Sequence, residues 1–176
     1  VVHRDLKPEN LMFTTSAGGA QVKLTDFGIA HVSVAGQSCF KVIGTPLYVA
    51  PEVVLQQPYG SPADLWSLGV MTHVLLVGFP PFHDADLVQL VQKVKFAHVR
   101  LTGDEWSRVT PAARAFVAAL LVRDPAARLT AVRALDHEWL SPDAFAAAAA
   151  AGPAAAARAA VNPLLETAQI NIRDYV

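Results

Sequence analysis

One stretch of the sequence limits the fold more than any other, because it has a clear helix start and then almost no polar face. Residues 61–64 read Ser-Pro-Ala-Asp, which gives an N-cap serine, a proline at the first helical position and a carboxylate three residues after the serine. From there to Leu76 the residues are apolar around nearly the whole helix. Such a helix is stable only when other elements surround it, so we expect a central, buried helix.

Three more helices are expected after the central one. The first starts at Asp84 and has apolar residues at the spacing of one helix face, at positions 87, 90, 91 and 94. Thr110 caps the second, which is expected to end at residues 124–125, and Thr130 caps the third, which is expected to run to about Leu140. Together with the central helix, these segments predict a helical bundle.

Short β structure is expected before the bundle. Residues 11–13 and 22–25 are β-prone runs on either side of Ser-Ala-Gly-Gly, which is a turn signal. The expected fold class is therefore α+β and mostly α, with short β hairpins followed by helices. Residues 141–176 are rich in alanine, so we expect one domain over residues 1–140 and a partly helical or disordered extension over residues 141–176.

Composition excludes several classes of function. The chain has 14 Lys and Arg against 15 Asp and Glu, a balance that argues against a protein that covers nucleic acid or anionic membrane. Cys39 is the single cysteine, which excludes an intrachain disulfide framework and fits a reducing compartment. No apolar run approaches the roughly 20 residues of a membrane span. We expect an intracellular protein of the cytoplasm, with the nucleus as an alternative. The chain begins at Val1 rather than methionine, so we expect a piece of a longer protein.

Three motifs carry the chemistry. Residues 3–10 read His-Arg-Asp-Leu-Lys-Pro-Glu-Asn, residues 26–28 read Asp-Phe-Gly, and residues 50–52 read Ala-Pro-Glu. In this order and spacing they resemble the signature motifs of eukaryotic protein kinases, over the C-terminal lobe of that domain. The lysine of the first motif and the stretch Gly-Thr-Pro-x-Tyr at residues 44–48 resemble serine/threonine kinases. Residues 59–82 are similar to the calcium/calmodulin-dependent kinase group.

The resemblance implies ATP and Mg²⁺ as cofactors and gives roles to single residues. Asp5 would accept the proton of a substrate hydroxyl, and Lys7 would face the transferring phosphate. Asn10 and Asp26 would hold Mg²⁺, because their oxygens are hard ligands. Met12 would form the floor under the adenine.

Other positions would support this site. Thr45 would hydrogen-bond beside the catalytic aspartate and lysine and help to align them. Phe27 would pack into the core and orient Asp26, and Gly28 would give the backbone freedom just after this metal ligand. His3 is expected to pack beside Phe27 rather than to act as a base.

Two longer-range contacts are also expected. Asp64 has two interpretations, either the capping-box partner of Ser61 or, by the resemblance, the anchor for the backbone of the His-Arg-Asp turn. Glu52 and Arg128 resemble a buried ion pair of the family, which ties the Ala-Pro-Glu motif to the Asp-Pro-x-x-Arg motif at residues 124–128.

Regulation is expected to depart from a common pattern of the family. In kinases with an arginine at the position of Arg4, a phosphorylated loop residue often pairs with it. Here the usual phosphoacceptor position holds Lys41, which cannot be phosphorylated on oxygen and would repel Arg4. Ser33 and Ser38 remain as alternative phosphosites.

The expected partners are protein substrates with serine or threonine, and Glu9 would recognise an arginine N-terminal to the phosphoacceptor. The Gly-rich loop, strand lysine and hinge of the N-terminal lobe do not occur in these 176 residues, so we expect the chain alone to be inactive. No calmodulin-binding segment is evident, because residues 141–176 contain only two basic residues. The alternative is a non-catalytic scaffold module derived from a kinase lobe.

Overall fold

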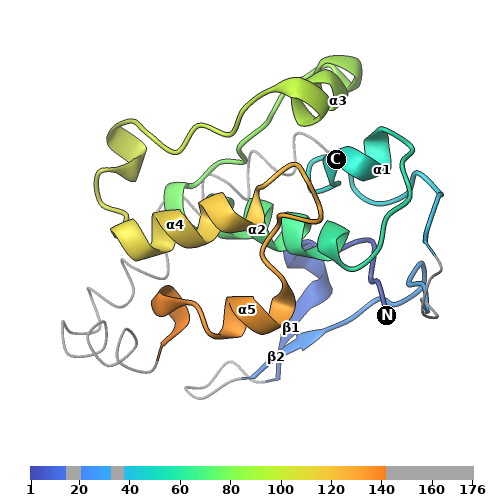
Figure 1. Cartoon of the computed structure of the whole chain (residues 1–176), viewed down its shortest axis with the longest axis horizontal. Helices are drawn as coiled ribbons and strands as arrows, with labels where there is room; N and C mark the ends of the chain where they lie inside the picture. Colours follow the sequence, from blue (N-terminus) through green and yellow to red (C-terminus); the bar gives the residue numbers. More distant parts are fainter. Residues whose placement is uncertain (15–20, 33–37, 142–176) are drawn as a thin grey trace.

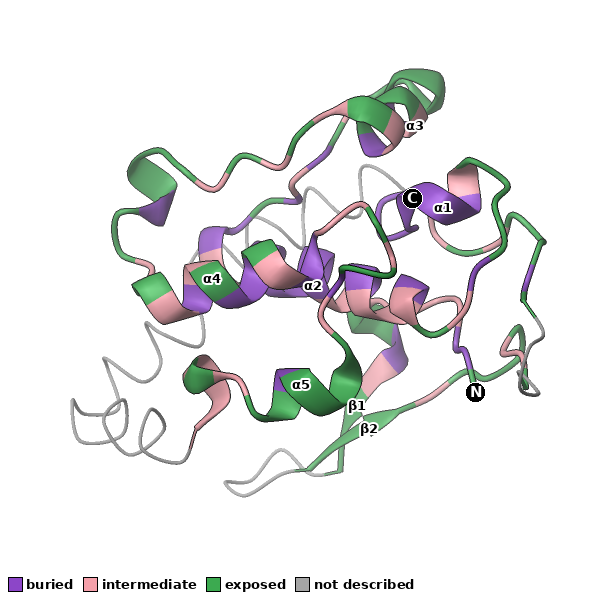
Figure 2. Cartoon of the chain, in the orientation of Figure 1, coloured by how far each residue is buried: buried purple, intermediate pink, exposed green. Residues whose placement is uncertain are grey.

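A computed structural model describes residues 1–14, 21–32 and 38–141. Within these ranges the protein is a mostly helical unit with one two-stranded sheet, and α2 (Pro62–Val77) runs through its centre (Figure 1). Most residues of α2 are buried (Figure 2), which confirms the prediction of a central helix. The expected proline is at its start, but the side chain of Ser61 makes no capping hydrogen bond.

α4 (Pro111–Leu120) packs along α2 at a short distance. A Cβ atom added at Gly69 of α2 would lie 2.8 Å from Leu120 Cβ, so only glycine permits this approach. Thr110 caps α4 as predicted, because its side chain accepts a hydrogen bond from the amide of Ala113. The helix ends at Leu120 rather than at residues 124–125, since the chain turns back there and the amide of Leu129 bonds to the carbonyl of Ala119.

The last predicted helix is interrupted. α5 (Ala131–Leu135) begins after the Thr130 cap, and a short 3₁₀ helix, η3 (Glu138–Leu140), follows it. His137 between them has extended backbone, and its Nδ1 accepts a hydrogen bond from the amide of Trp139. This local bond starts a new turn, which explains why the helix does not run through to Leu140.

α3 (Leu87–Phe96) lies on the outside of the unit (Figures 1 and 2). Its N-cap is Asp86, which accepts from the amide of Val88, and not Asp84 as predicted. Asp84 instead pairs with Lys93 at 2.8 Å, so its carboxylate is engaged one turn before the helix begins. Of the predicted apolar face, Leu90 and Val94 are buried, whereas Leu87 is exposed.

The predicted hairpin is present as β1 (Leu11–Phe13) and β2 (Val22–Leu24), which pair antiparallel with Leu11 opposite Leu24. The glycines of its expected turn lie outside the described residues. Isolated bridges join Val2 to His31 and Cys39 to Tyr59.

Three short helices complete the unit: η1 (Pro8–Asn10) before β1, α1 (Pro51–Val54) before α2, and η2 (Asp104–Trp106) before α4. No helix of the described part has the length and apolar character to span a membrane. The predicted alanine-rich extension falls outside the described residues from residue 142 onward and stays a prediction.

Candidate active site

The loop of residues 3–10 is fixed to the central helix by one carboxylate. Asp64 of α2 accepts the backbone amides of His3 at 2.7 Å and of Arg4 at 3.0 Å. Arg4 has a φ of 72°, so the chain turns sharply at this point. Burial raises the pKa of Asp64, although the two amide hydrogen bonds act in the opposite direction. Of its two interpretations, Asp64 therefore has the geometry of a backbone anchor, and it does not form a capping box with Ser61.

Asp5, Lys7 and Thr45 form one compact group. Lys7 Nζ lies 2.8 Å from Asp5 Oδ2, and it donates a hydrogen bond of 3.0 Å to Thr45 Oγ1. Asp5 Oδ1 accepts from the amide of Thr45 at 3.0 Å and from its hydroxyl at 2.7 Å. Asp5 and Thr45 are 40 positions apart in the chain, and the Asp5 carboxylate joins their two segments.

This group keeps Asp5 ionised. Partial burial acts to raise the pKa of Asp5, but the hydrogen bonds and charge of Lys7 and the hydrogen bonds of Thr45 outweigh it, and the pKa lies below its ordinary value. A carboxylate held in this state near neutral pH is available to accept a proton or to orient a hydroxyl group.

Asn10 and Asp26 lie at the same end of the hairpin, Asn10 just before β1 and Asp26 two residues after β2. The backbone of Asn10 accepts from both the amide and the hydroxyl of Thr25, which keeps the two segments side by side. Asn10 Nδ2 donates to the carbonyl of Asp5 at 2.8 Å, and no described residue bonds its side-chain oxygen. Asp26 is exposed and accepts from the amide of Gly28 at 3.2 Å.

These two oxygen ligands fit Mg²⁺. No group of three or more His, Cys, Asp or Glu side chains that could hold a metal occurs among the described residues. Mg²⁺ does not need one, because it is usually bound by one or two carboxylates together with substrate phosphates and water. A zinc-type site, which takes four protein ligands or three and a water, has no counterpart in the described part of the chain.

Phe27 departs from expectation. Its side chain is 55% exposed instead of packed in the core, and its ring contact is with His3, at 4.9 Å between centroids. Phe27 is exposed because no described segment covers its ring, and Met12 and Phe13 of β1 are exposed as well. His3 is buried beside Phe27, and its Nε2 lies 3.0 Å from the carbonyl of Thr25.

The residues expected to act in regulation and substrate recognition differ in their exposure and contacts. Arg4 Nε donates to the carbonyl of Ile29 at 2.5 Å, so this guanidinium has a backbone acceptor. Glu9 and Ser38 are exposed, whereas Ser33 lies outside the described residues.

The expected contact between Glu52 and Arg128 is a bidentate, buried ion pair. The Arg128 guanidinium lies 2.7 Å from Glu52 Oε1 and 2.9 Å from Oε2, and the two residues are 3% and 2% exposed. Arg128 also donates to three carbonyls, those of Pro62, Val122 and Arg123. The pair therefore connects α1, the start of α2 and the loop after α4.

Two contacts of the segment that carries Thr45 were not predicted. The Ser67 hydroxyl in α2 donates to the carbonyl of Tyr48 at 2.8 Å, and the Tyr59 hydroxyl donates to the carbonyl of Lys41 at 2.7 Å. Both acceptors are backbone carbonyls, and no sequence pattern marks such an acceptor.

Residues 1–140 match the family described as "Protein kinase domain". The chain is also 47% identical over 143 residues to "Calcium/calmodulin-dependent protein kinase type II subunit delta" from Oryctolagus cuniculus. That match covers 80% of this chain and 27% of the relative, so the chain spans about a quarter of the relative's length.

Proposed function

This chain belongs to the protein kinase family, and from that membership we propose that it forms the catalytic part of a serine/threonine protein kinase similar to the calcium/calmodulin-dependent group. The reaction is transfer of the γ-phosphate of ATP to a serine or threonine hydroxyl of a protein. The observation that carries the proposal is the group of Asp5, Lys7 and Thr45, with Asn10 bonded to the carbonyl of Asp5.

The residues of the chain divide the work as follows. Asp5 orients the attacking hydroxyl and accepts its proton, for which its lowered pKa keeps it ionised. Lys7 lies against Asp5 and Thr45, and its ammonium group would face the transferring phosphate. Asn10 and Asp26 would hold Mg²⁺, which would neutralise charge on the phosphate oxygens. Met12 is exposed on β1, and its side chain would contact the adenine.

Recognition of substrate is part of the same proposal. Glu9 is exposed one residue before Asn10, and its carboxylate would pair with an arginine N-terminal to the phosphoacceptor. The parts of the family's domain that cover ATP do not occur in these 176 residues. We therefore propose that activity belongs to a longer protein that contains this chain and a nucleotide-binding lobe, called the full-length kinase below.

The direct test measures phosphate transfer from labelled ATP by the full-length kinase to three matched peptides that differ only in a serine, threonine or tyrosine acceptor. We expect transfer to serine and threonine and none to tyrosine. The role of Glu9 is tested with two serine peptides, one with and one without an arginine N-terminal to the phosphoacceptor. The full-length kinase should prefer the peptide with arginine, and this preference should disappear in Glu9→Gln. A correctly folded full-length kinase that transfers phosphate to no peptide would favour the non-catalytic scaffold module instead.

The 176-residue chain by itself is expected to fold but to transfer no phosphate to a serine peptide. Its helices surround α2, whereas Asp26 is exposed, so its interaction with Mg²⁺ and phosphate acts through a high dielectric. Calorimetric titration with Mg·ATP should give weak binding, with a dissociation constant above about 1 mM. Micromolar binding, or turnover that disappears in Asp26→Ala, would contradict this expectation.

Phosphatase treatment is expected to leave most of the activity of the full-length kinase in place. Lys41 is at the usual phosphoacceptor position, and Arg4 already donates to the carbonyl of Ile29. Peptide phosphorylation is measured before and after treatment, with mass spectrometry to confirm that phosphate has been removed. A loss of activity that returns when Ser38 alone is phosphorylated would show that the protein does depend on a loop phosphate.

A further inference from the structure

Tyr59 holds the segment before Thr45 through three hydrogen bonds. Its amide donates to the carbonyl of Cys39 at 3.0 Å, and its carbonyl accepts from the amide of Cys39 at 2.8 Å. Its hydroxyl then reaches the carbonyl of Lys41 at 2.7 Å. Tyr59 is 5% exposed and lies two residues before Ser61, so these bonds connect the segment to the start of the rigid central helix.

The held segment leads directly to the catalytic group. Residues 41 to 45 span at most about 14 Å when extended, so the position of the Lys41 carbonyl limits where Thr45 can lie. Gly44 between them has a φ of 110°, and a Cβ added there would lie 2.6 Å from the carbonyl oxygen of Arg4. The chain is therefore fixed against the catalytic loop just before Thr45 bonds to Asp5.

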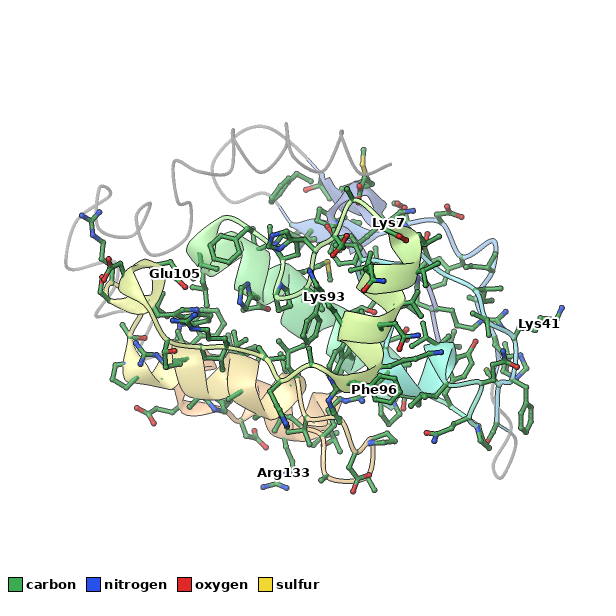
Figure 3. All side chains as sticks on the ribbon, turned by 90° about the horizontal axis from the view of Figure 1, so that it is seen from above. Lys7, Lys41, Lys93, Phe96, Glu105 and Arg133 are labelled. Carbon is green, nitrogen blue, oxygen red and sulfur yellow. The ribbon has the colours of Figure 1, made fainter. Side chains whose placement is uncertain are left out.

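Arg4 acts on the same tyrosine. Burial raises the pKa of Tyr59, and the Arg4 guanidinium acts in the opposite direction. A loop phosphate orders a segment by giving such an arginine a partner. In this chain the side chain of Lys41 is exposed at the rim of the molecule (Figure 3), and its backbone carbonyl makes the contact.

We propose that Tyr59 is a positioning residue that replaces a loop phosphate. Its hydroxyl holds the Lys41 carbonyl, and through residues 42–44 it keeps Thr45 in the position where it bonds to Asp5. The catalytic group is thereby assembled without modification of the segment. This inference rests on the proposed kinase function, but its structural part is measurable without catalysis.

The first experiment is hydrogen exchange on the 176-residue chain, comparing Tyr59→Phe with Tyr48→Phe. The two variants remove the same atom, but the buried Tyr48 hydroxyl has no hydrogen-bond partner among the described residues, which makes it a matched control. In Tyr59→Phe the amides of Cys39 and Thr45 should exchange about tenfold faster, while those of α2 keep their rates. Tyr48→Phe should leave both amides unchanged. Unchanged exchange in Tyr59→Phe, or faster exchange throughout α2, overturns the proposal.

The second experiment measures kinetics in the full-length kinase. Tyr59→Phe should lower kcat for a serine peptide about tenfold with the KM for ATP unchanged, because the group around Asp5 is misaligned while the nucleotide contacts are kept. Lys41→Ala should keep full activity, since the backbone carbonyl remains. If the wild-type protein transfers no phosphate, the proposed function fails and the exchange experiment still decides the role of Tyr59. The proposal is overturned if Tyr59→Phe leaves kcat unchanged. It is also overturned if the substitution raises the KM for ATP.

Discussion

Asp5→Asn in the full-length kinase should lower kcat by about 10²–10⁴-fold while the protein stays folded. The amide still accepts hydrogen bonds from Thr45, so the shape of the group is kept, but it cannot take a proton or pair with Lys7. Peptide phosphorylation and circular dichroism are measured on the same preparation. Asp5→Ala should lose at least as much activity, because it also removes the acceptor for Thr45.

Asp136→Asn is the matched control, since Asp136 is exposed and its carboxylate bonds to no described residue. It should leave kcat unchanged. The pKa of Asp5 lies below its ordinary value, so Asp5 is ionised throughout the neutral range and the loss in Asp5→Asn should be equal at pH 6 and pH 8. If Asp5→Asn instead loses activity together with its helical signal, Asp5 is a structural residue and the catalytic assignment is wrong.

Arg128→Met should lower the free energy of unfolding of the 176-residue chain by about 3–5 kcal/mol. Removing the guanidinium leaves the carboxylate of Glu52 buried without a partner, and three carbonyls lose a donor as well. The measurement is urea unfolding followed by circular dichroism. Arg133→Met is the control, because Arg133 is exposed and projects from α5 (Figure 3), and its effect should stay within about 0.5 kcal/mol.

The double variant Glu52→Leu, Arg128→Met separates two causes of this loss. Replacing both ions removes the unpaired charge, so the double variant should be more stable than Arg128→Met. It should remain less stable than the wild type, because the carbonyls of Pro62, Val122 and Arg123 stay without their donor. If Arg128→Met lowers the free energy of unfolding by less than about 1 kcal/mol, a stabilising role for the ion pair is contradicted.

The central helix could be predicted from sequence because its cause is local. Pro62 at the start and apolar residues on every face are properties of one continuous segment, and they determine both the helix and its burial. The ends of other helices were missed, because each depends on a particular bond. The bond from Trp139 to His137 divides the last predicted helix, and the pair of Asp84 and Lys93 delays the start of α3.

In the candidate site, too, features with a local cause could be predicted and features that depend on a distant partner could not. Motif resemblance selected Asp5, Lys7 and Thr45, which the structure places in contact. The choice between two interpretations of Asp64 could not be made from local pattern, since its partners are about 60 residues away in the chain. Tyr59 was missed because its partner is a backbone carbonyl, which every residue type carries.

The distance along the chain between Glu52 and Arg128 has a consequence for the order of assembly during synthesis. The two residues are 76 positions apart, and ribosomes add about 5–20 residues per second, so Glu52 is made roughly 4–15 s before its partner. During that interval burial of its carboxylate is unfavourable, and α1 lacks the ion pair that stabilises its position. The loop that carries Asp5 is thus made first, but the segment that carries Thr45 gains the support of this ion pair only after residue 128 has been added.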